Sequence, residues 1–255
     1  WQAPSADIVL ERGGRGIEAE LDLILSLGES EIAVEATASH DRATGVIEAA
    51  ARFSDFDPSS LARMTPRLSD LAEIRLPIAG EIGFEIGIDG QLRDARFDID
   101  GGPGTVVIPD FMPGDPVYEI QRITARGRFA GDLRLDELAI DYGGPLVTVS
   151  GRFKGDWNQP DAVAEISVTN LPVSAVPRFW RPDIAPGGRR WALERIHDGL
   201  IPKLEMKIDL RPEDWDKSLL DRTAVVGEFS FEDGVVEYLT GLPLAEVARA
   251  RGRFD

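Results

Sequence analysis

The chain of 255 residues contains no cysteine and only two histidines, His40 and His197. The lack of cysteine excludes disulfides and thiolate metal sites, and it is compatible with an oxidising compartment such as a periplasm. Neither histidine has a second histidine at metal-ligand spacing, and His197-Asp198 precedes Gly199 at an expected helix end. The sequence therefore predicts no catalytic residues, no metal site and no cofactor, and we expect that the protein is not an enzyme.

Positive charge and long apolar runs are also scarce. Against 45 acidic residues stand only 28 lysines and arginines, which gives a net charge of -17. This balance argues against nucleic-acid binding, which needs clustered basic residues, and it would keep most of the surface off an anionic bilayer. No apolar run approaches the roughly 20 residues of a transmembrane helix. Since both ends resemble cuts from a longer repetitive protein, we expect any anchor to lie outside this chain.

The chain contains a repeated motif, Gly-x-Phe. It occurs at Gly127–Phe129, Gly151–Phe153, Gly227–Phe229 and Gly252–Phe254. The first two copies begin 24 residues apart and the last two 25, which suits a pair of strands with their turns. A repeated unit of this size predicts an extended β-array, in which each unit rests on its neighbours.

Period-two alternation of apolar and polar residues is the dominant pattern. The clearest example runs from Glu81 to Asp89, where Ile82, Phe84, Ile86 and Ile88 alternate with glutamate and glycine. Turn pairs such as Asp89-Gly90 and Asp233-Gly234 separate the runs. The fold predicted from this pattern is mainly β: an elongated, twisted antiparallel sheet curled into an open groove, with two short helical inserts.

The two helical inserts break the alternation in related ways. The first is expected at about 57–71, with Asp57 as N-cap and Pro58 at the first helical position. The second is expected at about 173–198, with a helix from Pro186 to His197 that ends at Asp198-Gly199. No linker separates the two halves. We therefore expect 1–255 to be one continuous segment with approximate sub-units 1–115 and 116–255.

Several short motifs in the last third of the chain resemble the AsmA-like family, particularly its YhdP branch. The residues that carry this resemblance are Leu171-Pro172, Phe179-Trp180-Arg181-Pro182, Arg189-Arg190-Trp191, His197-Asp198-Gly199, Gly227–Phe231, Val235–Leu239 and Gly241–Pro243. The block from Phe179 to Trp191 is fairly specific, whereas Gly-x-Phe strands occur in many β-proteins. Ala192 departs from the pattern, since a larger aliphatic residue is expected there.

The resemblance implies a function. Members of the family are long envelope proteins of Gram-negative bacteria, held in the inner membrane by an N-terminal helix. Their periplasmic part is a repeating β-groove, and they are linked to phospholipid transport toward the outer membrane. By resemblance, this chain would be an internal periplasmic segment of a bridge-like lipid transfer protein. Its partners would be phospholipids, and its oligomeric state stays open.

The candidate lining of such a groove is the apolar set of the alternating runs. It comprises Leu21, Leu23, Ile82, Phe84, Ile86, Ile88, Phe129, Phe153, Leu204, Met206, Ile208 and Phe229. Alternation alone shows only that one face is buried, so these residues could equally form the core of a closed β-sandwich or lie beneath a helix. The resemblance favours the groove. The functional alternatives are a structural or chaperone-like element of envelope assembly and a closed binding module.

Phe179, Trp180 and Trp191 form a dense aromatic group beside several arginines. They could gate the groove, with the arginines on phosphate head groups. The simpler interpretation, which we prefer, is that the aromatic residues pack the helix onto the sheet end while the arginines pair with nearby acids.

Overall fold

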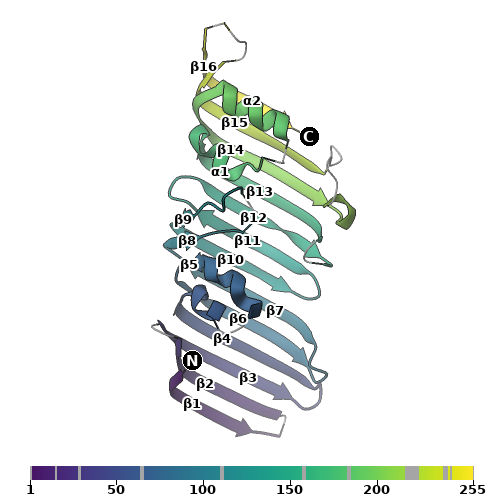
Figure 1. Cartoon of the computed structure of the whole chain (residues 1–255). Helices are drawn as coiled ribbons and strands as arrows, with labels where there is room; N and C mark the ends of the chain where they lie inside the picture. The colour runs from purple at the N-terminus through teal and green to yellow at the C-terminus, as the bar shows by residue number, and fades with distance from the viewer. Residues whose placement is uncertain are drawn as a thin grey trace.

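The computed structural model shows a mainly β protein built on one large open sheet (Figure 1). It describes residues 2–14, 16–27, 30–63, 66–109, 112–156, 159–182, 185–215, 224–237, 241 and 243–254. The large sheet has thirteen antiparallel strands, each paired with the next in chain order. They are β1 (Gln2–Arg12), β2 (Gly16–Leu27), β3 (Ser30–Asp41), β4 (Val46–Phe56), β6 (Ile78–Gly87), β7 (Leu92–Gly101), β10 (Arg122–Phe129), β11 (Leu133–Asp141), β12 (Leu146–Lys154), β13 (Asp161–Pro172), β14 (Ile196–Leu210), β15 (Val225–Val236) and β16 (Ala245–Phe254). The predicted fold class is confirmed.

The connection 211–224 contains the 3₁₀ helix η4 (Pro212–Asp214), and three longer connections interrupt the meander at 57–77, 102–121 and 173–195. They contain the 3₁₀ helices η1 (Pro58–Arg63), η2 (Pro66–Glu73) and η3 (Val173–Ala175), the strands β5 (Ile74–Arg75), β8 (Gly104–Val106) and β9 (Tyr118–Ile120), and the helices α1 (Val176–Phe179) and α2 (Pro186–Arg195). Successive connections of a meander alternate between the two ends of its strands. By this count all three lie at the same end, which we call the insert end. The opposite end is the hairpin end.

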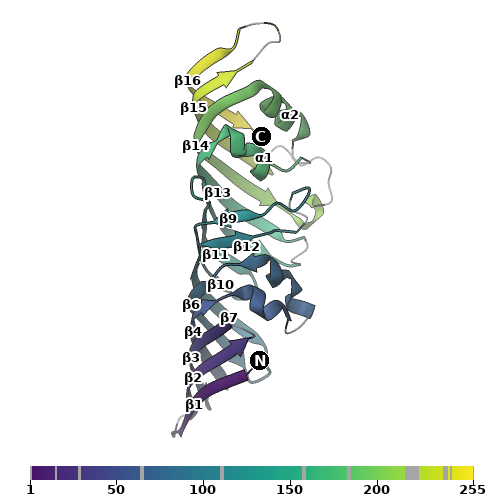
Figure 2. The ribbon, with the colours of Figure 1, turned by 60° about the vertical axis from the view of Figure 1, so that its left-hand side comes forward.

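The three connections form a second layer on one side of the sheet (Figure 2). We call it the insert layer. Its strands β5, β8 and β9 make a small antiparallel sheet. A polar joint links this sheet to α1, because the Tyr118 hydroxyl donates to the Arg178 carbonyl at 2.8 Å and the Arg178 guanidinium donates to the Val117 carbonyl at 2.8 Å. Phe179 adds ring contacts with Tyr118 and Tyr142, with centroids 6.0 and 5.1 Å apart.

The buried residues lie where this layer or a loop covers the sheet. Leu76, Tyr118 and Ile120 pack on Ile78, Ile123 and Ile140 of the large sheet. A second cluster joins Leu171 and Val176 to Val168 and its sheet neighbours. At the hairpin end, Ala162 and Leu210 are buried with Ala224. Each cluster occupies the same face of the sheet, so the inserts cover only parts of that face.

The molecule exposes much more surface than a compact domain. Its solvent-accessible area is 16685 Å² for a mass of 27.9 kDa. A compact monomer of this mass exposes roughly 11,000 Å². The excess follows from a single, elongated sheet that does not close on itself. Among the described residues, no helix has the length and apolar character needed to cross a membrane.

Some local expectations require correction. The first insert contains 3₁₀ helices, and Met64 and Thr65 within it lie outside the described residues. The second helix ends at Arg195, so His197 and Asp198 belong to β14, and Gly199 continues that strand at a φ of 133°. The third insert, 102–121, is not anticipated by the sequence pattern. Asp183 and Ile184 of the second insert, and Tyr238, Leu239 and Leu242 of the tail, also lie outside the described residues.

Candidate functional site

One face of the large sheet carries unbroken rows of apolar residues. Strand register defines each row, because residues paired across neighbouring strands point to the same side. The central row crosses all thirteen strands and contains no polar side chain. Its members are Ala6, Leu23, Val34, Phe53, Gly80, Ile99, Ala125, Leu138, Val149, Ile166, Met206, Gly227 and Phe254. We call this side the apolar face and the opposite side the polar face.

Two rows flank the central row toward the hairpin end, and both are apolar throughout. The first contains Ile8, Leu21, Ala36, Ala51, Ile82, Phe97, Gly127, Leu135, Gly151, Ala164, Ile208 and Val225. The second contains Leu10, Ala19, Ala38, Ala49, Phe84, Ala95, Phe129, Leu133, Phe153, Ala162 and Leu210. On the insert side, a further row joins Ile78, Gly101, Ile123, Ile140, Val147, Val168, Leu204, Phe229 and Gly252.

The structure places the candidate lining residues on this one face, with one exception. Leu21, Leu23, Ile82, Phe84, Phe129, Phe153, Leu204, Met206, Ile208 and Phe229 all belong to the rows above, and Ile86 pairs with Ile47 in the next row. Ile88 does not join them. Strand β6 ends at Gly87, and Ile88 stands in the following turn with 78% of its surface exposed. The turn forms early because the Gly90 N–H donates to the Gly87 carbonyl and Gly90 adopts a φ of 76°.

The repeated Gly-x-Phe motif has a packing explanation on this face. Gly227 of β15 pairs with Phe254 of β16, and Phe229 of β15 pairs with Gly252 of β16. A Cβ at either glycine would collide with the aromatic ring of its partner. In β10, a Cβ at Gly127 would stand only 2.7 Å from Cζ of Phe97. A phenylalanine ring therefore lies across three of the four glycines of the motif, whereas Gly151 faces Ala164 of β13.

Coverage of the apolar face changes along the sheet. On β13, Ala162 and Val168 are only 2% and 8% exposed, because Leu210 and Ala224 pack around Ala162 and the insert layer packs against Val168. On β1 and β2, Ile8, Leu10 and Ile17 are 63%, 69% and 44% exposed. Between these extremes, central residues such as Met206 and Leu138 are half-buried. The face is therefore an open apolar surface bordered by an insert layer, and it is not the interior of a closed sandwich.

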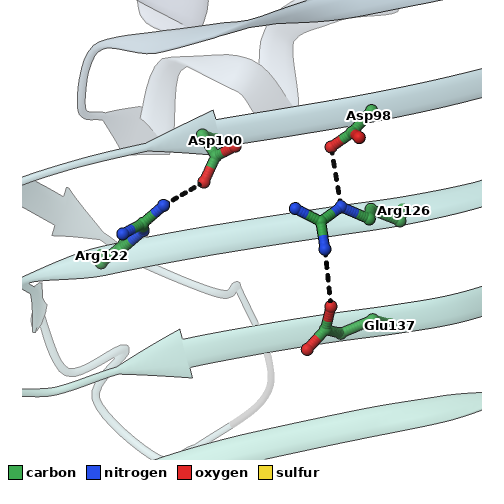
Figure 3. A network of polar contacts seen from close by, with 5 residues as sticks. All are labelled: Asp98, Asp100, Arg122, Arg126 and Glu137. Carbon is green, nitrogen blue, oxygen red and sulfur yellow. Dashed lines mark hydrogen bonds and ion pairs between the residues drawn. The ribbon is translucent and has the colours of Figure 1, made fainter.

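The polar face carries ladders of ion pairs. Arg126 bonds Asp98 on one neighbouring strand at 3.0 Å and Glu137 on the other at 3.2 Å, and Arg122 bonds Asp100 at 2.8 Å (Figure 3). The hydrogen bond and the charge of Asp98 raise the pKa of the Arg126 guanidinium. These side chains are about half exposed or more, so the network keeps this face hydrated and adds little stability.

The polar face carries shallow hollows. A shallow hollow of about 590 Å³ spans β2 to β7 and is lined by Glu18, Glu20, Glu48, Glu85, Asp94 and Arg96 among others. Its carboxylates make it unsuitable for acyl chains. Among the described residues, no group of histidine, aspartate and glutamate is arranged to hold a metal ion. We attach no function to this hollow, and we regard the apolar face as the candidate site because its lining is continuous.

The aromatic group of the second insert divides into packed and exposed members. Phe179 and Trp180 pack in the buried clusters, whereas Trp191 on α2 is 49% exposed. Arg189 donates to the Trp180 carbonyl at 2.7 Å, and Arg195 forms an ion pair with Glu237 at 3.1 Å. Packing therefore explains Phe179 and Trp180, whereas Trp191 is half-exposed and does not belong to these clusters.

His197 and Asp198 do not form a catalytic pair. The Asp198 carboxylate accepts from the N–H of Gly199 at 2.8 Å, and His197 Nε2 lies 3.9 Å from a Glu237 oxygen. No nucleophile stands in this group.

Comparison of the chain with models of known families, with characterised proteins and with solved structures finds no match. The apolar face is therefore the feature of the molecule that points to a function. The candidate lining left out the alanines of β2–β4, Phe97 and Leu133, although the alternating runs of the sequence include those alanines and Phe97. Their alternation with polar residues indicated an apolar side, but only the strand register shows which apolar residues of neighbouring strands lie side by side in one row.

Proposed function

We propose that this chain is a segment of a periplasmic lipid transfer bridge of the AsmA-like kind, whose apolar face holds phospholipid acyl chains. The observation that carries the proposal is the central row, which crosses thirteen strands from Ala6 to Phe254 without a polar side chain. In this proposal the parent protein is anchored in the inner membrane and phospholipids pass along the segment toward the outer membrane.

The dimensions of the sheet suit a conduit better than a pocket. Strands lie about 4.8 Å apart, so thirteen strands span roughly 58 Å, more than the length of one phospholipid. Moving an acyl chain from such a surface into water would cost about 0.8 kcal/mol of free energy for each CH₂ group that becomes exposed. A carrier path must therefore be apolar without interruption, and it need not fit one lipid tightly. The rows of the apolar face meet this requirement.

The direct test is photo-crosslinking at adjacent positions of one strand. Ala49 and Ala50 of β4 are both half-buried alanines, and they face the apolar and polar sides respectively. A benzophenone amino acid placed at position 49 should form adducts with phospholipid acyl chains in cells, detectable by mass spectrometry. The same group at position 50 should not. The pair Val149 and Ser150 of β12 repeats the comparison. Equal yields at paired positions, or no lipid adduct at 49 and 149, would contradict the proposal.

The two sheet edges favour a second candidate function. All residues of β1 are exposed, and β1 and β16 each pair on one side only. An exposed edge can take up another strand, as a structural or chaperone-like element of envelope assembly would. In that case crosslinks would concentrate on β1 and β16 and join protein to protein, with no lipid adduct at position 49.

A further inference from the structure

The outermost row of the apolar face differs from the others at its N-terminal end. It runs along the hairpin end through Arg12, Ile17, His40, Ile47 and Ile86. The four rows described above contain no polar side chain, whereas this one contains a guanidinium and an imidazole. Both therefore stand on the apolar side of the sheet, at the border where that face meets water.

Neither side chain has a hydrogen-bond or ion-pair partner among the described residues, but His40 interacts electrostatically with its neighbour Asp41. The N–H groups of Thr44 and Ala43 and, to a smaller extent, the charge of His40 lower the pKa of the Asp41 carboxyl. The nearest acids in sequence are Glu11 and Asp41. Glu11 pairs with Glu18 on the polar face, and the Asp41 carboxylate accepts from the N–H groups of Ala43 and Thr44 at 2.7 and 3.0 Å. Two side chains that carry N–H donors, a guanidinium and an imidazole, thus remain available beside the apolar face.

We propose that Arg12 and His40 bind the phosphate group of a lipid whose acyl chains lie along the apolar face. This inference rests on the proposed function and specifies one contact within it. The two residues are separated by one strand, so their Cα atoms lie roughly 10 Å apart, with the half-exposed Ile17 between them. A phosphate above Ile17 is within reach of both side chains. Arginine is well suited to bind it, since its planar fork pairs with two phosphate oxygens.

The site also has an energetic reason to lie at the border of the face. A phosphodiester cannot leave water without a charged partner, whereas its acyl chains gain from leaving it. Leu10 and Ala19 of the adjacent row continue the apolar floor inward from Arg12 and Ile17. A lipid could therefore keep its head group at the hairpin end of β1–β3 while its chains extend over the sheet.

The test compares two lipids with identical, fluorescently labelled acyl chains, phosphatidylglycerol and diacylglycerol. The double variant Arg12→Leu with His40→Leu removes the site. The control is Arg52→Leu with His197→Leu, which deletes the same residue types from the polar face and from β14. Circular dichroism and thermal unfolding verify that each protein is folded. We expect the unaltered protein and the control to bind phosphatidylglycerol about tenfold more tightly than diacylglycerol. The double variant should lose this preference and keep its affinity for diacylglycerol.

Other outcomes overturn the inference in distinguishable ways. Equal affinity of the unaltered protein for the two lipids, or a preference that survives in the double variant, would exclude a phosphate site at Arg12 and His40 while acyl-chain binding stands. Binding of inorganic phosphate to the lipid-free protein, lost in the double variant without any preference between lipids, would assign the pair to free phosphate. If neither lipid binds, the proposed function fails together with the inference.

Discussion

The strands β1–β4 and the strands β10–β14 carry the same alternation, yet they differ in what lies over their apolar side. In the second group, Ala162, Ala164 and Val168 are below 10% exposed; Ala162 packs with Leu210 and Ala224, and Val168 packs with residues of the insert layer. In the first group, Ile8 and Leu10 are mostly exposed, and Ile32 is the buried exception. The floors differ too, since alanines such as Ala36 and Ala49 give way to Phe129, Leu133 and Phe153.

Two effects contribute to this contrast: the insert layer packs over Val168 and its neighbours, and β1 is an edge strand that pairs on one side only. Where a long insert follows a strand, the apolar face becomes a local core. Where hairpins are short, the same kind of strand leaves its apolar side open. Apolar surface exposed in this way costs free energy in water, which is a reason to expect an apolar ligand over it.

The largest expected difference between the two regions concerns leucine truncation. Leu76 is 2% exposed within the cluster of Tyr118 and Ile120, so Leu76→Ala should lower the free energy of unfolding by about 2–5 kcal/mol. Leu21→Ala, on the open part of the apolar face, should cost about 1 kcal/mol. Urea unfolding of lipid-free protein measures both. Equal losses would show that the open strands are packed as tightly as the covered ones.

A second comparison uses glycines on opposite faces. A Cβ at Gly127 would stand 2.5 Å from the Arg134 carbonyl oxygen and 2.7 Å from Phe97, so Gly127→Ala should destabilise the protein by about 1–3 kcal/mol. At Gly83, on the polar face, the nearest atom is 3.7 Å away, so Gly83→Ala should change stability by no more than about 0.5 kcal/mol. Thermal unfolding tests both, and a tolerated Gly127→Ala would contradict the packing of rings across glycines.

The covered region should also respond to alkaline pH. Burial, with a smaller contribution from Tyr118, raises the pKa of Tyr142 to about 12. Because the fold favours the neutral phenol, this contribution to stability is complete below pH 10 and is lost as the pH rises toward 12. Unfolding measured from pH 8 to 11.5 should show a steeper loss for the unaltered protein than for Tyr142→Phe. If the stability of both proteins fell equally with pH, the Tyr142 hydroxyl would be exposed to solvent.

The smallest effect is expected on the polar face. Arg126→Ala removes two exposed ion pairs, to Asp98 and Glu137, and should cost at most about 1 kcal/mol at low ionic strength. In 1 M salt the difference should nearly vanish, because exposed charges are screened. A large, salt-independent loss would mean that the polar face, like the covered clusters, has a structural core.

Much of the fold could be predicted, because in a strand with one solvent-exposed face the alternation of polar and apolar residues shows which side chains point to solvent. The alternation of Ile82, Phe84 and Ile86 predicted a strand and its apolar side without any tertiary information. Ile88 extended the same alternation, but the Asp89-Gly90 turn ended the strand before it. The helix expected to reach His197 ended at Arg195, because Ile196 and the residues after it pair with β15. A local sequence pattern does not show such pairing between strands, because the paired residues are far apart in the chain.

The sequence by itself determined that the protein is built of antiparallel strands with one apolar side, since period-two alternation and the intervening turns act within a few residues. Only the tertiary structure decided which apolar residues are core, such as Leu76, and which stay open, such as Leu10. That outcome depends on three inserts meeting at one end of the sheet, and on register that aligns residues from Ala6 to Phe254 in one row. Both are contacts between residues distant in the chain, and a local pattern does not encode them.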